Sequence, residues 1–233
     1  MPLLEGGSAG SLGTADLEAM GVEVVAVNLL ELAVSPGLDA IAAAGGLAAF
    51  TGARASRVCG VILSVPAGEP PADGDRDGEG WRARRLPAVV RAAGDMLTVR
   101  SGVDGSTHVI DTTRLIADGA RLGGSPAADI VPGAMTTWWR RLADPLPDSG
   151  WVVSSVPADA AREGFYWTPG GWTTIGGEAS ETPGPLLSGC GCRACATATR
   201  GYLAHLWRQR EITASHLLGW HNLHQLRGIV EGR

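Results

Sequence analysis

Three cysteines within six residues constrain the fold of this chain more than any other feature. The segment reads C-G-C-R-A-C over residues 190–195, and His221 follows after an interval long enough for one helix. Three thiolates and one imidazole form a complete tetrahedral ligand set for Zn²⁺, which leaves no position for substrate or water. Cys190, Cys192, Cys195 and His221 therefore predict a structural zinc site. A cluster of ordinary buried cysteines is the alternative.

The remaining cysteine and the charge balance bound the classes of protein to consider. Cys59 stands alone, so this chain of 233 residues needs no disulfide, as is typical of a reducing cytoplasm. It has no run of about 18 apolar residues and no secretory leader pattern, so we expect a cytoplasmic protein without a membrane span. The net charge is −5 and every basic residue is arginine, which argues against independent binding to nucleic-acid phosphates.

The first fifty residues alternate between helix and strand. Thr14 is expected to cap a helix that Gly21 ends. An apolar strand is expected over residues 22–30, and a second helix over residues 38–44 after Pro36-Gly37. This rhythm is typical of a parallel sheet in an α/β fold.

Short elements and one long loop are expected in the middle of the chain. Residues 65–80 are rich in proline, glycine and acidic side chains, and they predict an exposed or mobile loop. Residues 97–110 predict a β-hairpin, and a helix is expected over residues 111–122 with Asp111 or Thr112 as its cap. A second β pair is expected over residues 165–175. The zinc turn and two helices are expected to follow it.

The segment that carries the cysteines resembles a known family. From Cys190 to Asn222 it follows the pattern C-x-C-x₂-C, then R-x-Y-L-x-H-L, then a leucine-rich turn and H-N. This looks like the C-terminal zinc subdomain of the tRNA-guanine transglycosylases, enzymes that exchange guanine in tRNA for a 7-deazaguanine. The resemblance implies that His221 is the fourth zinc ligand. It makes the other nearby histidines surface or packing residues: His205, His216 and His224.

Three earlier segments extend the resemblance to about two thirds of the chain. Residues 14–50 are similar to the first barrel units of the family, and residues 97–108 to its hairpin V-T-F-R-S-x-x-D-G-S-x-H. Residues 156–171 resemble the stretch V/L-P-T-R-x-x-R-N-G-x-x-F-T-x-x-G, with clear matches at Pro157, Gly164, Thr168 and Gly171. The implied fold is α/β: an incomplete or shortened TIM-barrel-like (β/α) domain over residues 1–178, and a zinc-binding helical subdomain over residues 179–233.

The residues that perform the family reaction have no counterpart in this chain. The family uses one aspartate as a nucleophile on the ribose and a second as acid and base. Val153 stands at the nucleophile position, and residues 54–60 replace the acid/base loop without a carboxylate. Residues 132–135 replace the stretch that reads the base, and the segment from Val131 to Trp151 is much shorter than in the family. An eight-unit barrel usually needs about 200 to 250 residues, so this chain cannot close one and also hold the zinc subdomain.

The leading hypothesis is a non-catalytic subunit, with no catalytic residue and one structural Zn²⁺. In the family the zinc region contributes to a two-fold dimer, and some members pair an active subunit with an inactive relative. The resemblance thus implies a dimer with a catalytic transglycosylase-like subunit or with a second copy. Tyr202, Leu206 and Trp207 fall at helical spacing and are the predicted contact residues. Transfer RNA would be reached only through the complex.

Two other hypotheses stay open. The chain could be an enzyme of altered chemistry that acts on a free nucleobase or nucleoside. It would then recruit residues such as Asp104, His108, Asp148 or Glu163, and a displaced nucleophile at Asp148 or Asp159 is conceivable. Tryptophans could stack a base in such a site: Trp138, Trp139, Trp151, Trp167 and Trp172. A non-enzymatic tRNA-binding module is the third hypothesis, and the acidic charge balance makes it the weakest.

Overall fold

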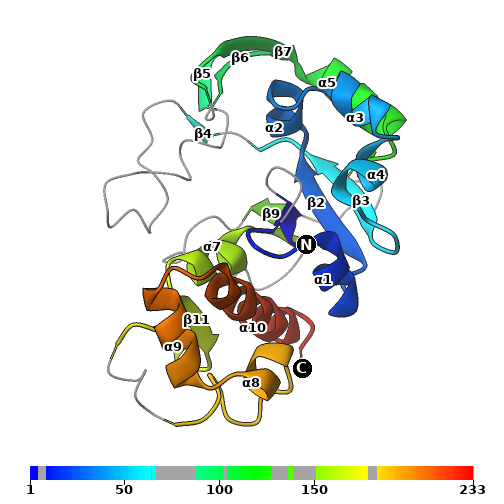
Figure 1. Ribbon diagram of the computed structural model, residues 1–233. Helices are drawn as coiled ribbons and strands as arrows, with labels where there is room; N and C mark the ends of the chain where they lie inside the picture. Colours follow the sequence, from blue (N-terminus) through cyan, green and yellow to red (C-terminus); the bar gives the residue numbers. More distant parts are fainter. Residues whose placement is uncertain are drawn as a thin grey trace.

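Parallel strands lie at the centre of the molecule, as Figure 1 shows. The computed structural model describes residues 1–4, 9–63, 65–66, 88–101, 104–126, 136–138, 151–177 and 183–232. One four-stranded sheet has the order β1 (Leu3–Leu4), β2 (Val24–Asn28), β3 (Arg57–Val61) and β8 (Ser125–Pro126). A two-stranded sheet pairs β9 (Thr136–Trp138) with β10 (Trp151–Val153). All of these strands pair in parallel.

The two parallel sheets join between β10 and β1. The backbone N–H of Leu3 donates to the carbonyl of Ser154 at 3.0 Å, within a parallel bridge between Pro2 and Ser154. The strands therefore follow the order β9-β10-β1-β2-β3-β8. Among the strands that the structure describes, β8 and β9 are edges that do not pair with each other, so no closed barrel is formed. The predicted parallel α/β sheet is confirmed.

Short helices cover one face of this sheet. They are α1 (Thr14–Ala19), α2 (Leu29–Val34), α3 (Leu38–Ala43), α4 (Leu47–Thr51) and α5 (Thr112–Arg121). Alternate strand residues point to this face because side chains alternate along a strand. Leu4, Val25, Val27 and Val58 are buried there with the leucines of the helices. This layer is the main hydrophobic core.

Two local predictions about this region need correction. Gly13, not Thr14, is the N-cap of α1, and the hydroxyl of Thr14 instead donates to the carbonyl of Thr51 at 2.8 Å. The strand expected over residues 22–30 ends at Asn28, because the Asn28 side chain accepts from the backbone N–H of Leu30 and caps α2. A cap at that position converts an apolar run from strand to helix, which hydrophobicity alone does not reveal.

A mixed sheet lies beyond the helices. Its strands are β4 (Val65–Pro66), β5 (Ala88–Ala93), β6 (Met96–Arg100) and β7 (Thr107–Asp111). In this sheet β4 pairs with β5 in parallel, and the other two pairs are antiparallel. The pairing of β6 with β7 confirms the predicted hairpin, and Asp111 caps α5 by accepting from the backbone N–H of Arg114 at 3.1 Å. The predicted loop over residues 65–80 begins instead with β4, and its remainder lies outside the described residues.

The last third of the chain gathers around one long helix. It contains α7 (Val156–Arg162), β11 (Phe165–Thr168), β12 (Gly171–Thr174), α8 (Arg193–Thr197), α9 (Arg200–Arg208) and α10 (Ile212–Val230). The β11–β12 pair confirms the expected β pair, and three helices follow it where two were expected. In Figure 1, α10 lies against α7 and β11 as well as α8 and α9. The predicted division between residues 178 and 179 stays a prediction. None of the described helices is long and apolar enough to cross a membrane.

Candidate metal centre and the neighbouring catalytic position

The four predicted zinc ligands converge on one point. The Sγ atoms of Cys190, Cys192 and Cys195 lie 3.8, 3.5 and 3.4 Å from Nδ1 of His221. All four ligand atoms lie within 4.8 Å of one another. Zinc–sulfur bonds near 2.3 Å and zinc–nitrogen bonds near 2.05 Å imply a sulfur-to-nitrogen distance of about 3.6 Å in a tetrahedral site. The residues present therefore fit a zinc ion in number, type and spacing.

Two helices bring these ligands together. Cys192 is the N-cap of α8, and its Sγ accepts from the backbone N–H of Cys195 at 3.5 Å. That turn places three sulfurs on one side of a short loop. His221 is fully buried in the middle of α10, so the position of its ring follows from the packing of that helix. The histidine interval in the sequence corresponds to α9 and the first half of α10.

The second nitrogen of His221 is held by the backbone. Nε2 lies 2.9 Å from the carbonyl oxygen of Trp167 in β11. A carbonyl only accepts, so Nε2 carries the proton and Nδ1 is left as a metal ligand. The edge of the buried Tyr166 ring lies against the imidazole, with centroids 6.0 Å apart. The tautomer that zinc requires is thus the one that the fold selects.

The electrostatics of the thiols favour a cation. The thiol of Cys192 donates to Cys195, and this hydrogen bond lowers the pKa of Cys195 to about 4. The same contact and burial raise the pKa of Cys192 above the usual range. One thiolate is therefore already favoured at neutral pH, and a bound cation would replace the remaining thiol protons.

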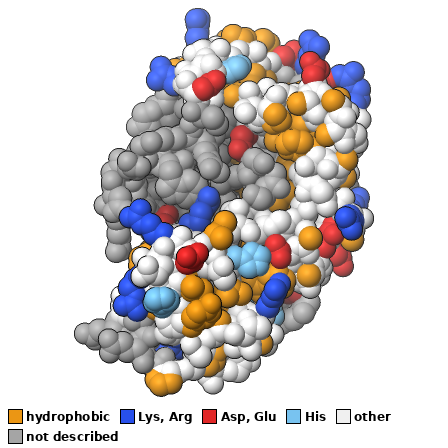
Figure 2. Space-filling view, in the orientation of Figure 1, with side chains coloured by type: hydrophobic (Ala, Val, Ile, Leu, Met, Phe, Trp, Pro, Cys, Tyr) orange, Lys and Arg blue, Asp and Glu red, His pale blue; other side chains and the backbone are white. Residues whose placement is uncertain are grey.

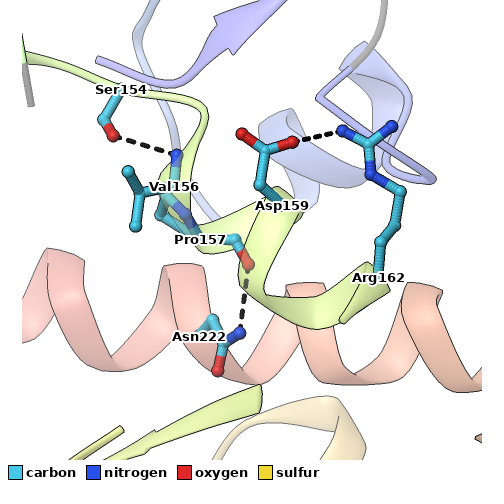
Figure 3. Close-up of polar contacts among 6 residues, drawn as sticks. All are labelled: Ser154, Val156, Pro157, Asp159, Arg162 and Asn222. Atoms are coloured by element: carbon cyan, nitrogen blue, oxygen red, sulfur yellow. Dashed lines mark hydrogen bonds and ion pairs between the residues drawn. The ribbon is translucent and has the colours of Figure 1, made fainter. Parts of the chain in front are cut away.

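The neighbouring residue Asn222 ties the centre to the rest of the domain. Its Oδ1 accepts from the backbone N–H of Trp167 at 2.9 Å, and its Nδ2 donates to the carbonyls of Pro157 and Phe165 at 3.0 Å. Figure 3 shows the side chain reaching from α10 to the start of α7. The adjacent residues His221 and Asn222 thus have separate roles. The His221 side chain faces the thiols, and the Asn222 side chain forms hydrogen bonds with three backbone groups.

The other histidines near the cluster lie outside it. His205 and His224 are exposed on α9 and α10. His216 points to the amino-terminal part of the chain, where its Nδ1 lies 3.1 Å from the carbonyl of Ser11 and its Nε2 lies 3.8 Å from Asp16. These positions agree with the surface and packing roles that the resemblance implies.

The three predicted contact residues of α9 differ in exposure. Tyr202 is 53% exposed, whereas Leu206 and Trp207 are half-buried. The Trp207 ring fills the space above Gly164 and Gly176, where a built Cβ would come within 2.4 and 3.0 Å of it. The buried residues of α9 are Leu203 and Ala204, which form its core-facing side. The role of the three residues in pairing stays a prediction.

Val153 is packed on the inner face of the parallel sheet. It is 1% exposed and belongs to a small apolar cluster with Leu3, Ala26, Cys59 and Val61. The strand register places Leu3, Ala26 and Cys59 in one row across β1, β2 and β3. Burial also raises the pKa of the Cys59 thiol to about 11, so this cysteine stays protonated near neutral pH. Val153, which is predicted to stand at the nucleophile position of the family, is therefore part of a hydrophobic cluster.

The loop at residues 54–60, which is predicted to replace the family's acid/base segment, is held by hydrogen bonds to a carboxylate in α1. The Glu18 carboxylate in α1 accepts from the backbone N–H groups of Arg54, Ala55 and Ser56 at 2.7, 2.7 and 2.9 Å. These three hydrogen bonds lower the pKa of Glu18. The loop is stabilised by a carboxylate on its outer side and supplies none of its own.

Asp159, the conceivable displaced nucleophile, lies in α7. Its side chain is 1% exposed and forms an ion pair with Arg162 one turn later. Figure 3 shows both side chains on the side of α7 that faces away from α10. Arg162 also matches the second arginine of the family stretch, a correspondence that the sequence comparison missed. Asp148, the other candidate, lies outside the described residues.

Among the described residues proposed for altered chemistry, Asp104 and His108 share a contact with Ser106, whereas Glu163 lies apart from them. Asp104 accepts from the backbone N–H and the hydroxyl of Ser106, and these bonds lower the pKa of Asp104 to about 2. The Ser106 hydroxyl also lies 2.6 Å from Nε2 of His108. Glu163 lies elsewhere, at the end of α7. The rings of Trp167 and Trp172 meet edge to face at 83°, which is packing geometry rather than a flat stacking surface. Trp151 is partly buried, and the side chains of Trp138 and Trp139 lie outside the described residues.

Two surface features complete the description. A pocket of about 460 Å³ lies between α10 and the starts of β1 and β2, and its lining contains none of the predicted zinc or contact residues. On the face drawn in Figure 2, arginine side chains are scattered around the periphery and alternate with acidic ones. The described side chains on that face form no continuous basic stripe of the kind that tracks a nucleic-acid backbone.

Comparison with known proteins supports the same relationship. Residues 151–232 match the family model described as queuine tRNA-ribosyltransferase. A queuine tRNA-ribosyltransferase from Cereibacter sphaeroides is 40% identical over 78 residues, which are 33% of this chain and 21% of that protein. One from Deinococcus radiodurans is 38% identical over 76 residues, which are 32% of this chain and 19% of that protein. These matches span about a fifth of the length of the relatives.

A longer alignment covers the whole chain. A queuine tRNA-ribosyltransferase from Nitratidesulfovibrio vulgaris is 22% identical over 332 residues, which include all of this chain and 84% of that protein. The alignment is longer than the chain, so the relative has internal segments without a counterpart here. The α/β architecture with a Cys₃His cluster thus defines a transglycosylase-like protein. The chain is similar to the queuine tRNA-ribosyltransferase family, most clearly over residues 151–232.

Proposed function

We propose that this chain is a non-catalytic subunit that supports a base-exchange transglycosylase acting on tRNA, of the 7-deazaguanine or queuosine type. The observation that carries the proposal is the packing of Val153. An aspartate nucleophile needs solvent-accessible space for a ribose, whereas Val153 is sealed among Leu3, Ala26 and Cys59. Valine has no group that can attack C1′, and no nearby carboxylate is available from the loop at residues 54–60.

The zinc centre is the retained part of the family machinery in this proposal. Cys190, Cys192, Cys195 and His221 would hold one Zn²⁺ in a closed set of four ligands. Bound zinc would supply cross-linking of the cysteine turn to α10, since no open position remains for Lewis-acid chemistry on a substrate. The side chains of His221 and Asn222 would then transmit that rigidity to β11 and α7.

The fold assignment under this proposal is a shortened TIM-barrel-like domain over residues 1–178 with a zinc-binding subdomain over residues 179–233. The order β9-β10-β1-β2-β3-β8 supports it, because consecutive parallel strands with their helices on one face are the arrangement of a barrel segment. Strands β8 and β9 end this order among the described strands, and the edge of a sheet can offer backbone groups to a partner. We propose a dimer on this basis, preferably with a catalytic transglycosylase-like subunit and otherwise with a second copy, in the cytoplasm.

An enzyme of altered chemistry is the second candidate, and the Asp104–Ser106–His108 contacts are the observation that could favour it. A hydroxyl has one proton, and Asp104 accepts without donating. If Ser106 donates to Asp104, then Nε2 of His108 must donate to Ser106 and cannot remove its proton. This direction stabilises the turn and leaves Ser106 without a base, so we favour the non-catalytic subunit.

A guanine-exchange assay tests the proposal. Incorporation of radiolabelled guanine into tRNA is measured with the purified chain, with a full-length transglycosylase from the same host, and with both together. We expect no incorporation by the chain alone, co-elution of the two proteins, and greater activity or stability of the pair. Incorporation by the chain alone that disappears in Asp159→Asn would instead establish a displaced nucleophile. Incorporation that persists in Asp159→Asn would point to another residue of the chain and would equally overturn the proposal.

A further inference from the structure

Cys190 has an outer hydrogen-bond partner that the sequence pattern does not contain. Nε2 of Gln225 lies 2.9 Å from the Cys190 sulfur. The family pattern quoted above ends at H-N, so position 225 is not part of it. A thiolate only accepts, so the amide must present its nitrogen to the sulfur, and the orientation of the side chain is settled by chemistry.

The helical register explains how Gln225 reaches this sulfur. His221 and Gln225 are four residues apart on α10, and residues at this spacing lie on the same side of a helix. One turn of α10 therefore supplies the imidazole and the amide to the same cluster. The exposed residue His224 precedes Gln225 on another side of the helix and contributes nothing to the cluster.

The net charge of the zinc-bound centre explains why a hydrogen bond from the Gln225 amide would stabilise it. Three thiolates around Zn²⁺ leave one uncompensated negative charge on the sulfurs. Hydrogen-bond donors to the sulfurs stabilise this negative charge, as the Cys195 backbone N–H does for Cys192 at 3.5 Å. Cys190 is only half-buried, and Gln225 stands beside its sulfur. Loss of this donor would leave the negative charge on the Cys190 sulfur less stabilised.

We propose that Gln225 is a positioning residue of the zinc site, which holds the Cys190 thiolate on the metal by donating to its sulfur. The proposal rests on the zinc part of the proposed function and is independent of the subunit role. Loss of an outer partner of this kind typically weakens metal binding about 10-fold to 100-fold. Removal of the amide should therefore weaken zinc retention without removing the site.

The test compares four full-length proteins: wild type, Gln225→Met, Gln225→Glu and the neighbouring control His224→Met. Methionine keeps the length of the side chain and its helix propensity while removing the donor. Zinc affinity is measured by competition with a chromophoric chelator. The sulfur-to-cobalt charge-transfer bands of Co²⁺-loaded protein report on the thiolates directly, and far-UV circular dichroism of the zinc-loaded proteins checks the fold.

We expect Gln225→Met to weaken zinc binding about 10-fold and to shift the charge-transfer bands. Gln225→Glu should weaken binding further, because a carboxylate would face a thiolate, and His224→Met should match wild type. Wild-type affinity and unchanged bands in Gln225→Met would overturn the role of Gln225. Equal losses in Gln225→Met and His224→Met would also overturn it, because they would indicate a general effect on α10. A wild-type protein that binds no zinc would instead refute the metal site itself.

Discussion

The zinc cluster and the sheet face that carries Val153 differ in how closely they match the family pattern. At the cluster, every ligand that the family pattern contains is present, and the four ligand atoms lie at zinc-like spacing. At the sheet, Val153 stands at the predicted nucleophile position and is buried among apolar residues. Under the proposed function, a residue set that stabilises the fold has been kept, while a set that performs chemistry has been replaced by packing. This difference is expected of a protein that has a structural role and no catalytic one.

The connection between the two regions makes the comparison testable. Asn222 follows the ligand His221 and donates to the carbonyl of Pro157, which lies only four residues after Val153. The backbone path from the zinc ligands to the sheet is therefore short. If the zinc region supports the sheet, damage to the cluster should propagate to α7, whereas damage at Val153 should leave the cluster intact.

Removal of a zinc ligand should have the largest effect. We expect Cys192→Ser, or chelation of the wild type, to unfold the region from the cysteine turn through α10, because structural zinc contributes about 10–16 kcal/mol in small zinc domains. Hydrogen exchange on zinc-loaded and zinc-free protein would measure this region by region. The conservative control Cys59→Ser lies in the sheet and should leave metal content unchanged. A zinc-free protein with full protection in α10 would break the comparison.

An aspartate in place of Val153, at the predicted nucleophile position, should have the next largest effect. Val153→Asp would place an unpaired carboxylate among Leu3, Ala26 and Cys59, and we expect a loss of several kcal/mol in the free energy of unfolding. Val153→Ala, which only opens a small cavity, should cost about 2 kcal/mol. Urea denaturation of the three proteins gives the values. Near-equal stability of wild type and Val153→Asp would mean that the position retains a solvated site.

Loss of the Asn222 side chain should have an intermediate effect. Asn222→Ala would remove three hydrogen bonds and leave the groups at Pro157, Phe165 and Trp167 without their partner, at a cost of about 3 kcal/mol. The same denaturation measurement checks it, together with the zinc content of the variant. Asn222→Asp keeps the acceptor for Trp167 but turns a buried carboxylate oxygen toward the carbonyls of Pro157 and Phe165, so it should cost more than Asn222→Ala. An unchanged stability of Asn222→Ala would show that the two regions are energetically independent.

The zinc cluster could be predicted from the sequence, whereas the hydrogen bonds that connect it to the rest of the molecule could not. Cysteine spacing is a short-range signal, so Cys190, Cys192, Cys195 and His221 could be read directly. The hydrogen bonds of Asn222 and Gln225 depend on which backbone and sulfur atoms face α10, and that is a result of tertiary packing. The inward position of Trp207 above two glycines likewise depends on how α9 meets the β11–β12 pair. In the same way, the helix α2 depended on a cap at Asn28 rather than on hydrophobic pattern.

The smallest expected effect concerns Glu18, which lies far from the metal ligands in sequence and holds the loop before β3. Its carboxylate accepts from the N–H groups of Ser56, Ala55 and Arg54, and these bonds lower its pKa below the ordinary value of 4.5. A lowered folded-state pKa means that this stabilisation is fully present above pH 4.5 and is lost as the pH falls through the folded-state value. Zinc release at low pH also destabilises the fold, so wild type and Glu18→Gln must be compared, both loaded with zinc.

In that comparison, Glu18→Gln should be slightly less stable than wild type at pH 7, and the gap should narrow as the pH falls below 4.5, because the glutamine has no charge to lose. Urea denaturation across this range gives the difference. The zinc content of both proteins should fall in parallel, since Glu18 belongs to the sheet region. If Glu18→Gln instead lost zinc at a higher pH than wild type, the loop before β3 would be coupled to the cluster. Helix α1 would then belong with the zinc region rather than with the sheet.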